Sequence, residues 1–196
     1  MITCTRGPEA PPMNWNLPNT LTWARIFAIP LIVLLFYMPY SWADVAAGLL
    51  FAAAGITDSL DGYFARRFNQ ISRLGAFLDP VADKLIVAVA LVLLISKDPR
   101  ALIVLTAAVI IGREITISAL REWMAEIGAR RKVAVSQLGK YKTILQITGL
   151  SMMLYRWPLL GLPTYRIGVV LTVVAAGATL VSMLAYLRAA WPELNR

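Results

Sequence analysis

Residues Val45 to Ser96 read VAAGLLFAAAGITDSLDGYFARRFNQISRLGAFLDPVADKLIVAVALVLLIS. One uncharged run ends at Thr57, a charged segment follows, and a second uncharged run begins at Leu85. Each run has only about a dozen residues, whereas a membrane-spanning helix needs about 20. We therefore expect each helix to continue into the charged segment, which places the charges of that segment at one membrane face.

The same pattern continues along the rest of the chain. Charged segments follow the second uncharged stretch, precede the third, follow the fourth and precede the fifth, so six antiparallel spans place all of them on one face. The sequence therefore predicts an all-α integral membrane protein with six transmembrane helices, in one domain over residues 14–196. Residues 1–13 are polar and proline-rich, which predicts a disordered N-terminal extension. The uncharged stretches are Ile26–Ala43, Val45–Thr57, Leu85–Ser96, Ala101–Gly112, Thr143–Tyr155 and Ile167–Leu187.

The composition supports a membrane protein over a soluble one. Of 196 residues, 59% are hydrophobic and 15% are charged, and the mean hydropathy is +0.66, whereas soluble domains have roughly 25% charged residues. The chain has no histidine and one cysteine, Cys4. This excludes Ser/His/Asp triads, histidine zinc sites and an intramolecular disulfide. Catalysis must therefore use carboxylates, lysine, arginine, hydroxyls or oxygen-bound metals.

The net charge of +8 fits an orientation signal better than a nucleic-acid interface. Thirteen Lys and Arg residues fall on the charged face of the predicted bundle, against four on the opposite face. Basic residues concentrate on the cytoplasmic side of membrane proteins. We therefore expect a multi-pass membrane protein whose charged face is cytoplasmic. The four opposite residues are Lys97, Arg100, Arg156 and Arg166.

Four aspartates lie in the charged segments of the second and third helices. If the second helix begins near Val45, Asp58 lies about 13 residues along it, roughly 20 Å, and remains below the interface. An ionised carboxylate at that depth is costly unless it is paired or metal-bound. Asp58 and Asp61 share one helix face, as do Asp79 and Asp83. Oxygen-only ligands favour magnesium or manganese, and four aspartates suit two ions.

An alternative is that these aspartates only pair with nearby basic residues, namely Arg66, Arg67 and Lys84. Small residues favour a ligand instead, because Gly62 and Ala65 leave room for a diphosphate beside the backbone. Arg66 lies one turn beyond Gly62, from where its guanidinium can bind phosphate oxygens.

The segment from Asp58 to Asp83 fits the pattern D-x2-D-G-x2-A-R-x8-G-x3-D-x3-D at every fixed position. It resembles the signature of the CDP-alcohol phosphatidyltransferases. The segments 16–22, 113–126 and 133–143 resemble the bacterial branch of this family that makes phosphatidylglycerophosphate. The resemblance runs from about Asn14 to the end of the chain.

The resemblance implies a six-helix membrane enzyme, usually a homodimer, that uses two Mg²⁺ ions, with Mn²⁺ as an alternative. It would transfer the phosphatidyl group from CDP-diacylglycerol to glycerol 3-phosphate, giving phosphatidylglycerophosphate and CMP. Asp58, Asp61 and Asp79 correspond to ligands of one ion, and Asp58, Asp79 and Asp83 to ligands of the other. Asp83 also corresponds to the proton acceptor of the family. The CDP-diacylglycerol site would comprise Pro18, Asn19, Thr20, Gly62, Ala65, Arg66, Ser72 and Gly75.

The phosphate of the acceptor needs cations of its own. Arg113 lies inside the fourth predicted helix, where an unpaired guanidinium is costly, and Arg121 lies 80° from it around the helix. Lys140 and Lys142 are 200° apart on the fifth helix, so only one is expected to face the site. Arg113 and Lys140 are the first choices, and Arg121 and Lys142 the second. The alternative for all four is anchoring to anionic lipid headgroups.

Two other functions compete with this prediction. Another family member, such as a phosphatidylinositol-phosphate, phosphatidylserine or cardiolipin synthase, would use the same chemistry on a different alcohol. A cation transporter would use the aspartates as an ion path. That path would need polar residues to continue outward, but Leu85–Ser96 is almost wholly apolar.

Overall fold

The computed structural model describes residues 17–68, 73–128, 137–159 and 161–194. Within the helices, the side chains of residues 17–21, 58–77, 137–140, 189 and 192–194 are outside this description. The predicted extension, residues 1–13, also lies outside it. The described residues form six α-helices and, apart from an isolated bridge between Leu159 and Leu162, no β-structure, which confirms the all-α prediction. The helices are α1 (Leu17–Tyr37), α2 (Ser41–Phe68), α3 (Arg73–Lys97), α4 (Ala101–Glu126), α5 (Gln137–Tyr155) and α6 (Thr164–Leu194).

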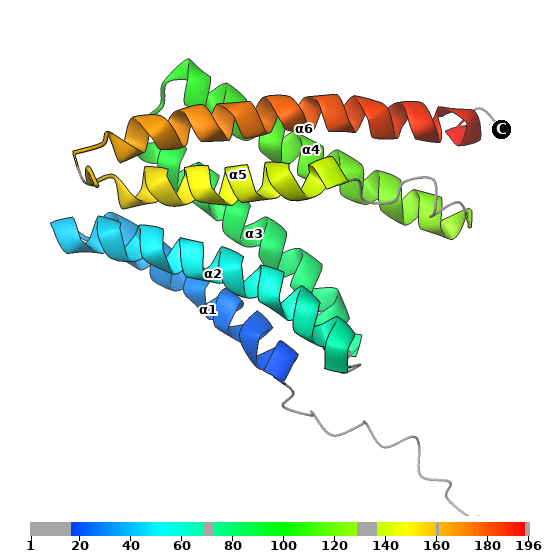
Figure 1. Cartoon of the computed structure of the whole chain (residues 1–196), viewed down its shortest axis with the longest axis horizontal. Helices are drawn as coiled ribbons and strands as arrows, with labels where there is room; N and C mark the ends of the chain where they lie inside the picture. The colour runs from blue at the N-terminus through cyan, green and yellow to red at the C-terminus, as the bar shows by residue number, and fades with distance from the viewer. Residues whose placement is uncertain (1–16, 69–72, 129–136, 160, 195–196) are drawn as a thin grey trace, which may run out of the picture.

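The short uncharged stretches do continue into their charged neighbours. Helix α2 runs on through the aspartate segment to Phe68, and α3 begins at Arg73, well before the uncharged run at Leu85. Helix α4 likewise extends to Glu126, while α5 begins at Gln137. The charged ends of α2, α3, α4 and α5 lie toward the right and lower side of the bundle (Figure 1). The predicted grouping of charged segments at one end is therefore present.

The start of the second helix differs from the prediction. It was expected near Val45, but α2 begins at Ser41 after α1 ends at Tyr37, so the uncharged stretch Ile26–Ala43 is divided between the two helices. Pro39 explains the break, because the residue before a proline is disfavoured in helical conformation. Since α2 begins at Ser41, Asp58 lies 17 residues after the start (58 minus 41), about 26 Å along the axis. Asp58 therefore lies further along the helix, and closer to its charged end, than it would if the helix began at Val45.

In the part of the chain that the structure describes, two helices contain windows long and apolar enough to span a bilayer, Ala101–Glu126 and Thr164–Arg188. Shorter apolar helical segments occur at Thr22–Tyr37 and Ser41–Thr57. Large hydrophobic side chains are exposed on the outside of the bundle, including Phe27, Leu105 and Val181. Such a surface is expected where a protein faces lipid. The buried core between the helices is built mainly of leucine, isoleucine and alanine.

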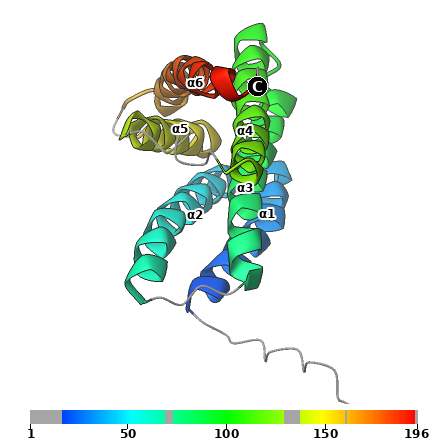
Figure 2. The same ribbon diagram turned by 90° about the vertical axis from the view of Figure 1, so that its right-hand side faces the viewer.

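Helices α5 and α6 form the most extensive helix pair, and two glycines allow their close approach. A Cβ atom added at Gly168 would lie 2.7 Å from the carbonyl oxygen of Gly149. One added at Gly149 would lie 2.5 Å from the hydroxyl oxygen of Thr172. Small residues commonly bring membrane helices together in this way. Figure 2 shows α5 and α6 as a pair beside the upright α3 and α4.

We expect Gly168→Ala to destabilise the fold, because the added methyl group meets backbone that cannot move aside without separating α5 from α6. The matched control is Gly177→Ala on the same helix, where an added Cβ has no neighbour within 4 Å. That control is expected to be neutral or to stabilise by up to ~1 kcal/mol, since alanine favours helix more than glycine does. Thermal unfolding in detergent compares the two variants. Equal melting temperatures would contradict the packing role of Gly168.

A polar network joins the helices at the end opposite the aspartates. Arg100 donates two hydrogen bonds to Asp98, at 2.7 and 2.6 Å, and the Tyr165 hydroxyl donates a third. The hydrogen bonds from Arg100 are the main reason why the pKa of Asp98 falls to about 2. Nearby, Lys97 pairs with Asp44 at 3.6 Å. These contacts tie the turn between α3 and α4 to α6 and α2.

Candidate active site

The aspartates of α3 are held by side chains from α1. The hydroxyl of Thr22 donates a hydrogen bond to Oδ1 of Asp79, and the guanidinium of Arg25 donates one to Oδ1 of Asp83. Thr22 and Arg25 lie about one turn apart on α1, as do Asp79 and Asp83 on α3. The Arg25 side chain is only 1% exposed. Two parallel contacts thus fix the orientation of both carboxylates relative to α1.

The other two aspartates are placed by the backbone alone. Asp58 and Asp61 lie in the last turns of α2, and Asp79 and Asp83 lie in the first half of α3, so all four belong to one end of an antiparallel helix pair. The side chains of Asp58 and Asp61 are outside the described residues. Among the described residues there is no cluster of three side chains that could hold a metal ion. Only two of the four aspartates, Asp79 and Asp83, have described side chains. Metal binding by the four therefore stays a prediction.

The chemistry of the described groups fits a hard divalent cation. The side chains gathered near Asp79 and Asp83 offer carboxylate and hydroxyl oxygen, and the chain has no histidine. Magnesium and manganese prefer such oxygen ligands. Among the described residues, Lys84 forms no ion pair with either aspartate, although the alternative interpretation assigned it that role. Asp83 is instead paired with Arg25.

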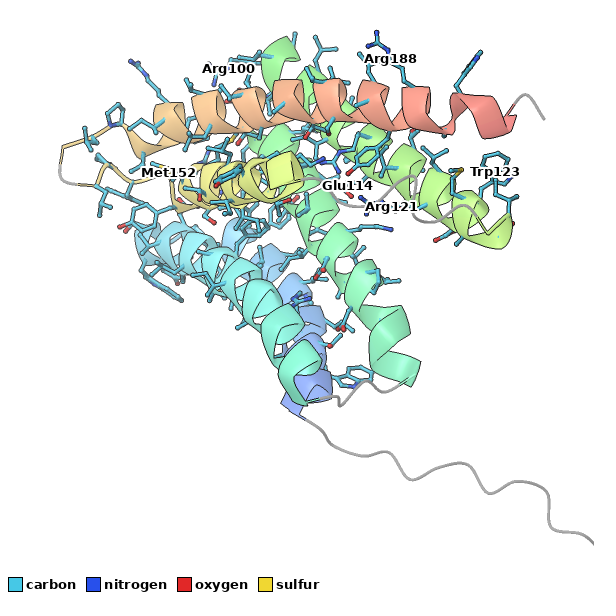
Figure 3. The ribbon with its side chains drawn as sticks, turned by 45° about the vertical axis from the view of Figure 1, so that its right-hand side comes forward. Arg100, Glu114, Arg121, Trp123, Met152 and Arg188 are labelled. Carbon is cyan, nitrogen blue, oxygen red and sulfur yellow. The ribbon has the colours of Figure 1, made fainter. Side chains whose placement is uncertain are left out.

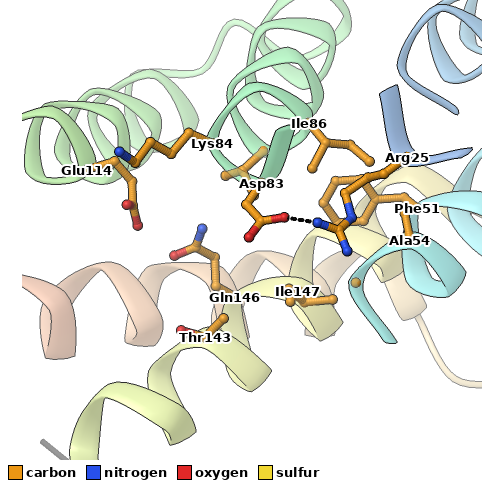
Figure 4. Close-up of a pocket in the computed structure, with 12 residues that line it drawn as sticks. Arg25, Phe51, Ala54, Asp83, Lys84, Ile86, Glu114, Thr143, Gln146 and Ile147 are labelled. Atoms are coloured by element: carbon orange, nitrogen blue, oxygen red, sulfur yellow. Dashed lines mark hydrogen bonds and ion pairs between the residues drawn. The ribbon is translucent and has the colours of Figure 1, made fainter. Parts of the chain in front are cut away.

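A cavity of about 140 Å³ opens beside Asp83 and receives side chains from five helices. Figure 4 shows the Asp83 carboxylate at its centre, bonded to Arg25 on one side, with the Gln146 amide and the Lys84 and Glu114 side chains on the other. Its apolar wall comes largely from α2 and α3. The cavity is therefore mainly apolar, with a few polar and charged side chains projecting into it. Its lining residues are Arg25, Phe51, Ala54, Gly55, Asp83, Lys84, Ile86, Val87, Glu114, Thr143, Gln146 and Ile147.

An apolar groove of about 330 Å³ lies next to this cavity, between α3 and α4. The two share Lys84, Val87 and Glu114, and the remaining lining of the groove is aliphatic. A cavity that contains charged side chains and borders an apolar groove suits a substrate with a charged head and a hydrocarbon tail.

Buried cations lie close to the cavity at Asp83. Arg113 is 7% exposed; it pairs with Glu114 at 2.9 Å and donates a hydrogen bond to the Thr179 hydroxyl at 3.2 Å. Its Nε has no hydrogen-bond partner among the described residues. Lys142 is also buried and donates to the Ser182 hydroxyl at 2.9 Å. Buried positive charge that exceeds its carboxylate partners favours an anionic ligand.

Three of the four predicted acceptor residues lie near one another. Lys142 is within electrostatic range of Arg113 and Arg121. Arg121 is exposed and lies over the Tyr186 ring, 5.6 Å from its centroid. The side chain of Lys140 is outside the described residues. Lys142 is the candidate for binding the acceptor phosphate because its side chain is buried. Figure 3 shows Arg188, in contrast, pointing away from the bundle.

The predicted CDP-diacylglycerol residues lie at the same end as the aspartates. Pro18, Asn19 and Thr20 form the first turn of α1, while Gly62, Ala65 and Arg66 lie in the last turns of α2. Gly75 lies in the first turn of α3. Ser72 and all side chains of this set are outside the described residues. Their roles in nucleotide binding stay predictions.

Several polar residues of the site were not predicted from the sequence. Thr22 and Arg25 lie about one turn apart on α1, as the two aspartates do on α3. This similar spacing is the sequence signal that could have indicated the two contacts between the helices. Gln146 lies one turn after Lys142 on α5, so the two residues share a helix face. The partners of the buried cations depend on how α4, α5 and α6 pack. The unpredicted residues are Thr22, Arg25, Glu114, Gln146, Thr179 and Ser182.

Comparison with known proteins decides the family. A sequence model of the CDP-alcohol phosphatidyltransferases matches residues 15–185. The chain belongs to the CDP-alcohol phosphatidyltransferase family. It is 50% identical over 185 residues to the CDP-diacylglycerol–glycerol-3-phosphate 3-phosphatidyltransferase of Escherichia coli strain K12, covering 93% of this chain and 98% of that protein. The enzyme of the same name from Shigella flexneri is equally similar, with the same coverage. The phosphatidyltransferase family is membrane-bound, in agreement with the predicted fold.

Proposed function

We propose that this protein transfers the phosphatidyl group from CDP-diacylglycerol to glycerol 3-phosphate, forming phosphatidylglycerophosphate and CMP. The near full-length similarity to enzymes named for this reaction supports the proposal. The observation that carries it is the cavity into which the Asp83 carboxylate projects, with buried Arg113 and Lys142 close by. A reacting carboxylate beside buried cations suits an acceptor that has both a hydroxyl and a phosphate.

In the reaction, the 1-hydroxyl oxygen of glycerol 3-phosphate attacks the β-phosphorus of CDP-diacylglycerol. The bond from this phosphorus to the CMP oxygen breaks, and the hydroxyl proton passes to Asp83. Arg25 holds Asp83 from α1, so the carboxylate faces the cavity in a fixed orientation. Arg113 and Lys142 would bind the acceptor phosphate, and Arg121 would add positive charge at the entrance.

The residues that would hold two Mg²⁺ ions are Asp58, Asp61, Asp79 and Asp83. When bound, such ions neutralise the diphosphate and stabilise the departing CMP. Thr22 fixes Asp79 by its hydrogen bond. This hydrogen bond keeps the Asp79 carboxylate at the end of α3 where the diphosphate would bind.

The protein would lie in the bacterial cytoplasmic membrane with the aspartate end facing the cytoplasm. The excess of basic residues at this end supports the orientation, as does the supply of the water-soluble acceptor from the cytoplasm. A homodimer is the proposed assembly.

The apolar groove between α3 and α4 supports a substrate with acyl chains.

The test is an assay of CMP release by the purified protein in detergent, with CDP-diacylglycerol and Mg²⁺. Glycerol 3-phosphate, inositol phosphate, serine and phosphatidylglycerol are compared as acceptors. We expect release with glycerol 3-phosphate and none above background with the others. Release with another acceptor alone would overturn the proposed acceptor and retain the family chemistry.

A further inference from the structure

Gln146 is a buried polar side chain that points into the cavity beside Asp83. The residue is 4% exposed, and its amide lies between the carboxylates of Asp83 and Glu114 (Figure 4). Among the described residues it has no hydrogen-bond partner. The proposed reaction assigns it no role.

A primary amide has two donor hydrogens and an acceptor oxygen. Buried polar groups in proteins nearly always have partners, and those that lack them cluster at functional sites. Because the amide of Gln146 faces a cavity large enough for a small molecule, a bound ligand is the natural partner. A neutral group that both donates and accepts is suited to a hydroxyl rather than to a phosphate.

The position of Gln146 identifies which hydroxyl it would meet. Asp83 faces the same cavity and would receive the proton of the attacking 1-hydroxyl. Lys142 lies one turn before Gln146 on α5, on the same helix face, and would bind the phosphate. In glycerol 3-phosphate the 2-hydroxyl lies between the reacting hydroxyl and the phosphate, and Gln146 shares the cavity with Asp83 and a helix face with Lys142. Glu114, a carboxylate that also lines the cavity, is already paired with Arg113 in an ion pair of 2.9 Å.

We propose that Gln146 binds the 2-hydroxyl of glycerol 3-phosphate and thereby selects the acceptor. This inference rests on the proposed function, because it takes Asp83 and Lys142 as the groups that bind the two ends of the acceptor. It adds a residue that determines specificity and that takes no part in proton transfer. Loss of its amide should therefore affect the choice between acceptors more than the reaction itself.

The experiment compares two acceptors, glycerol 3-phosphate and 3-hydroxypropyl phosphate, which lacks only the 2-hydroxyl. The wild-type protein is expected to prefer glycerol 3-phosphate by at least about tenfold in kcat/KM. Gln146→Met keeps the length of the side chain and removes its hydrogen bonds. We expect this variant to lose about tenfold in kcat/KM for glycerol 3-phosphate, with little change for the analogue, so that the preference nearly disappears.

Ser151→Ala is the matched control, since Ser151 is also a polar residue of α5 but donates its hydroxyl hydrogen to the backbone of Ile147. It should keep the wild-type preference. If Gln146→Met does not fold, Gln146→Leu is measured by the same ratio. An equal loss with both acceptors would mean a structural role and would overturn the assignment of Gln146 alone. A wild-type protein that does not use glycerol 3-phosphate would overturn the proposed function as well.

Discussion

Replacement of Asp79 by asparagine is expected to lower the rate of CMP release by about a thousandfold or more. Asp79 lies on α3, where the Thr22 hydroxyl fixes one of its oxygens. Asparagine has the same size, and its carbonyl oxygen still accepts the hydrogen bond from Thr22. The fold should therefore survive, while the negative charge needed to bind a divalent cation is lost.

Thr22→Val provides the comparison for Asp79→Asn. It removes the hydrogen bond to Asp79 and leaves the carboxylate charge in place. Loss of such a supporting contact typically costs about tenfold to a hundredfold in metal affinity or activity. We expect Thr22→Val to need more Mg²⁺ for half-maximal activity, and Asp79→Asn to stay inactive at any Mg²⁺ concentration. Near wild-type turnover by Asp79→Asn, with the helical circular dichroism unchanged, would refute the role of Asp79.

The second large effect is expected for Arg113→Met, which should raise the KM for glycerol 3-phosphate by about a hundredfold. The guanidinium is buried between Glu114 and Thr179, and loss of a buried charged partner typically costs about 2–5 kcal/mol. Because the acceptor phosphate would lose one of its two buried cations, the effect should fall mainly on KM. Arg113→Lys keeps the charge without the forked geometry and should raise KM by about tenfold.

Arg188→Met is the control for lipid anchoring. Arg188 is exposed on the outer side of α6 and points away from the bundle (Figure 3). If Arg113 only anchored the protein to anionic headgroups, both variants would respond alike to the content of anionic lipid in proteoliposomes. We expect KM for glycerol 3-phosphate to be unchanged in Arg188→Met. An unchanged KM in Arg113→Met would contradict the acceptor site.

The helices were predictable because charge and hydropathy constrain them over long stretches. The uncharged runs were too short to span alone, and their extension into the charged segments follows from bilayer thickness, as α2 and α3 show. The start of α2 was expected near Val45 and lies at Ser41, because the apolar run continues across the turn and Pro39 alone marks it. A single proline is a weaker signal than a change in polarity.

The site was only partly predictable for a different reason. The paired spacing of the aspartates is local, within one helix at a time, and the sequence shows it directly. Contacts such as that of Arg25 with Asp83 join residues that are distant along the chain, so Arg25 was counted only among the thirteen basic residues of the charged face. The position of Gln146 beside Asp83 could not be predicted either, because it depends on a cavity that five helices enclose.

The most direct test of phosphatidyl transfer to glycerol 3-phosphate follows the acceptor into the lipid. Purified protein is given CDP-diacylglycerol, Mg²⁺ and isotope-labelled glycerol 3-phosphate, and both CMP and labelled phosphatidylglycerophosphate are measured by mass spectrometry. The proposed reaction predicts one labelled lipid for each CMP released. Release of CMP without label in the lipid would contradict it, since that result would mean hydrolysis of the donor instead of transfer.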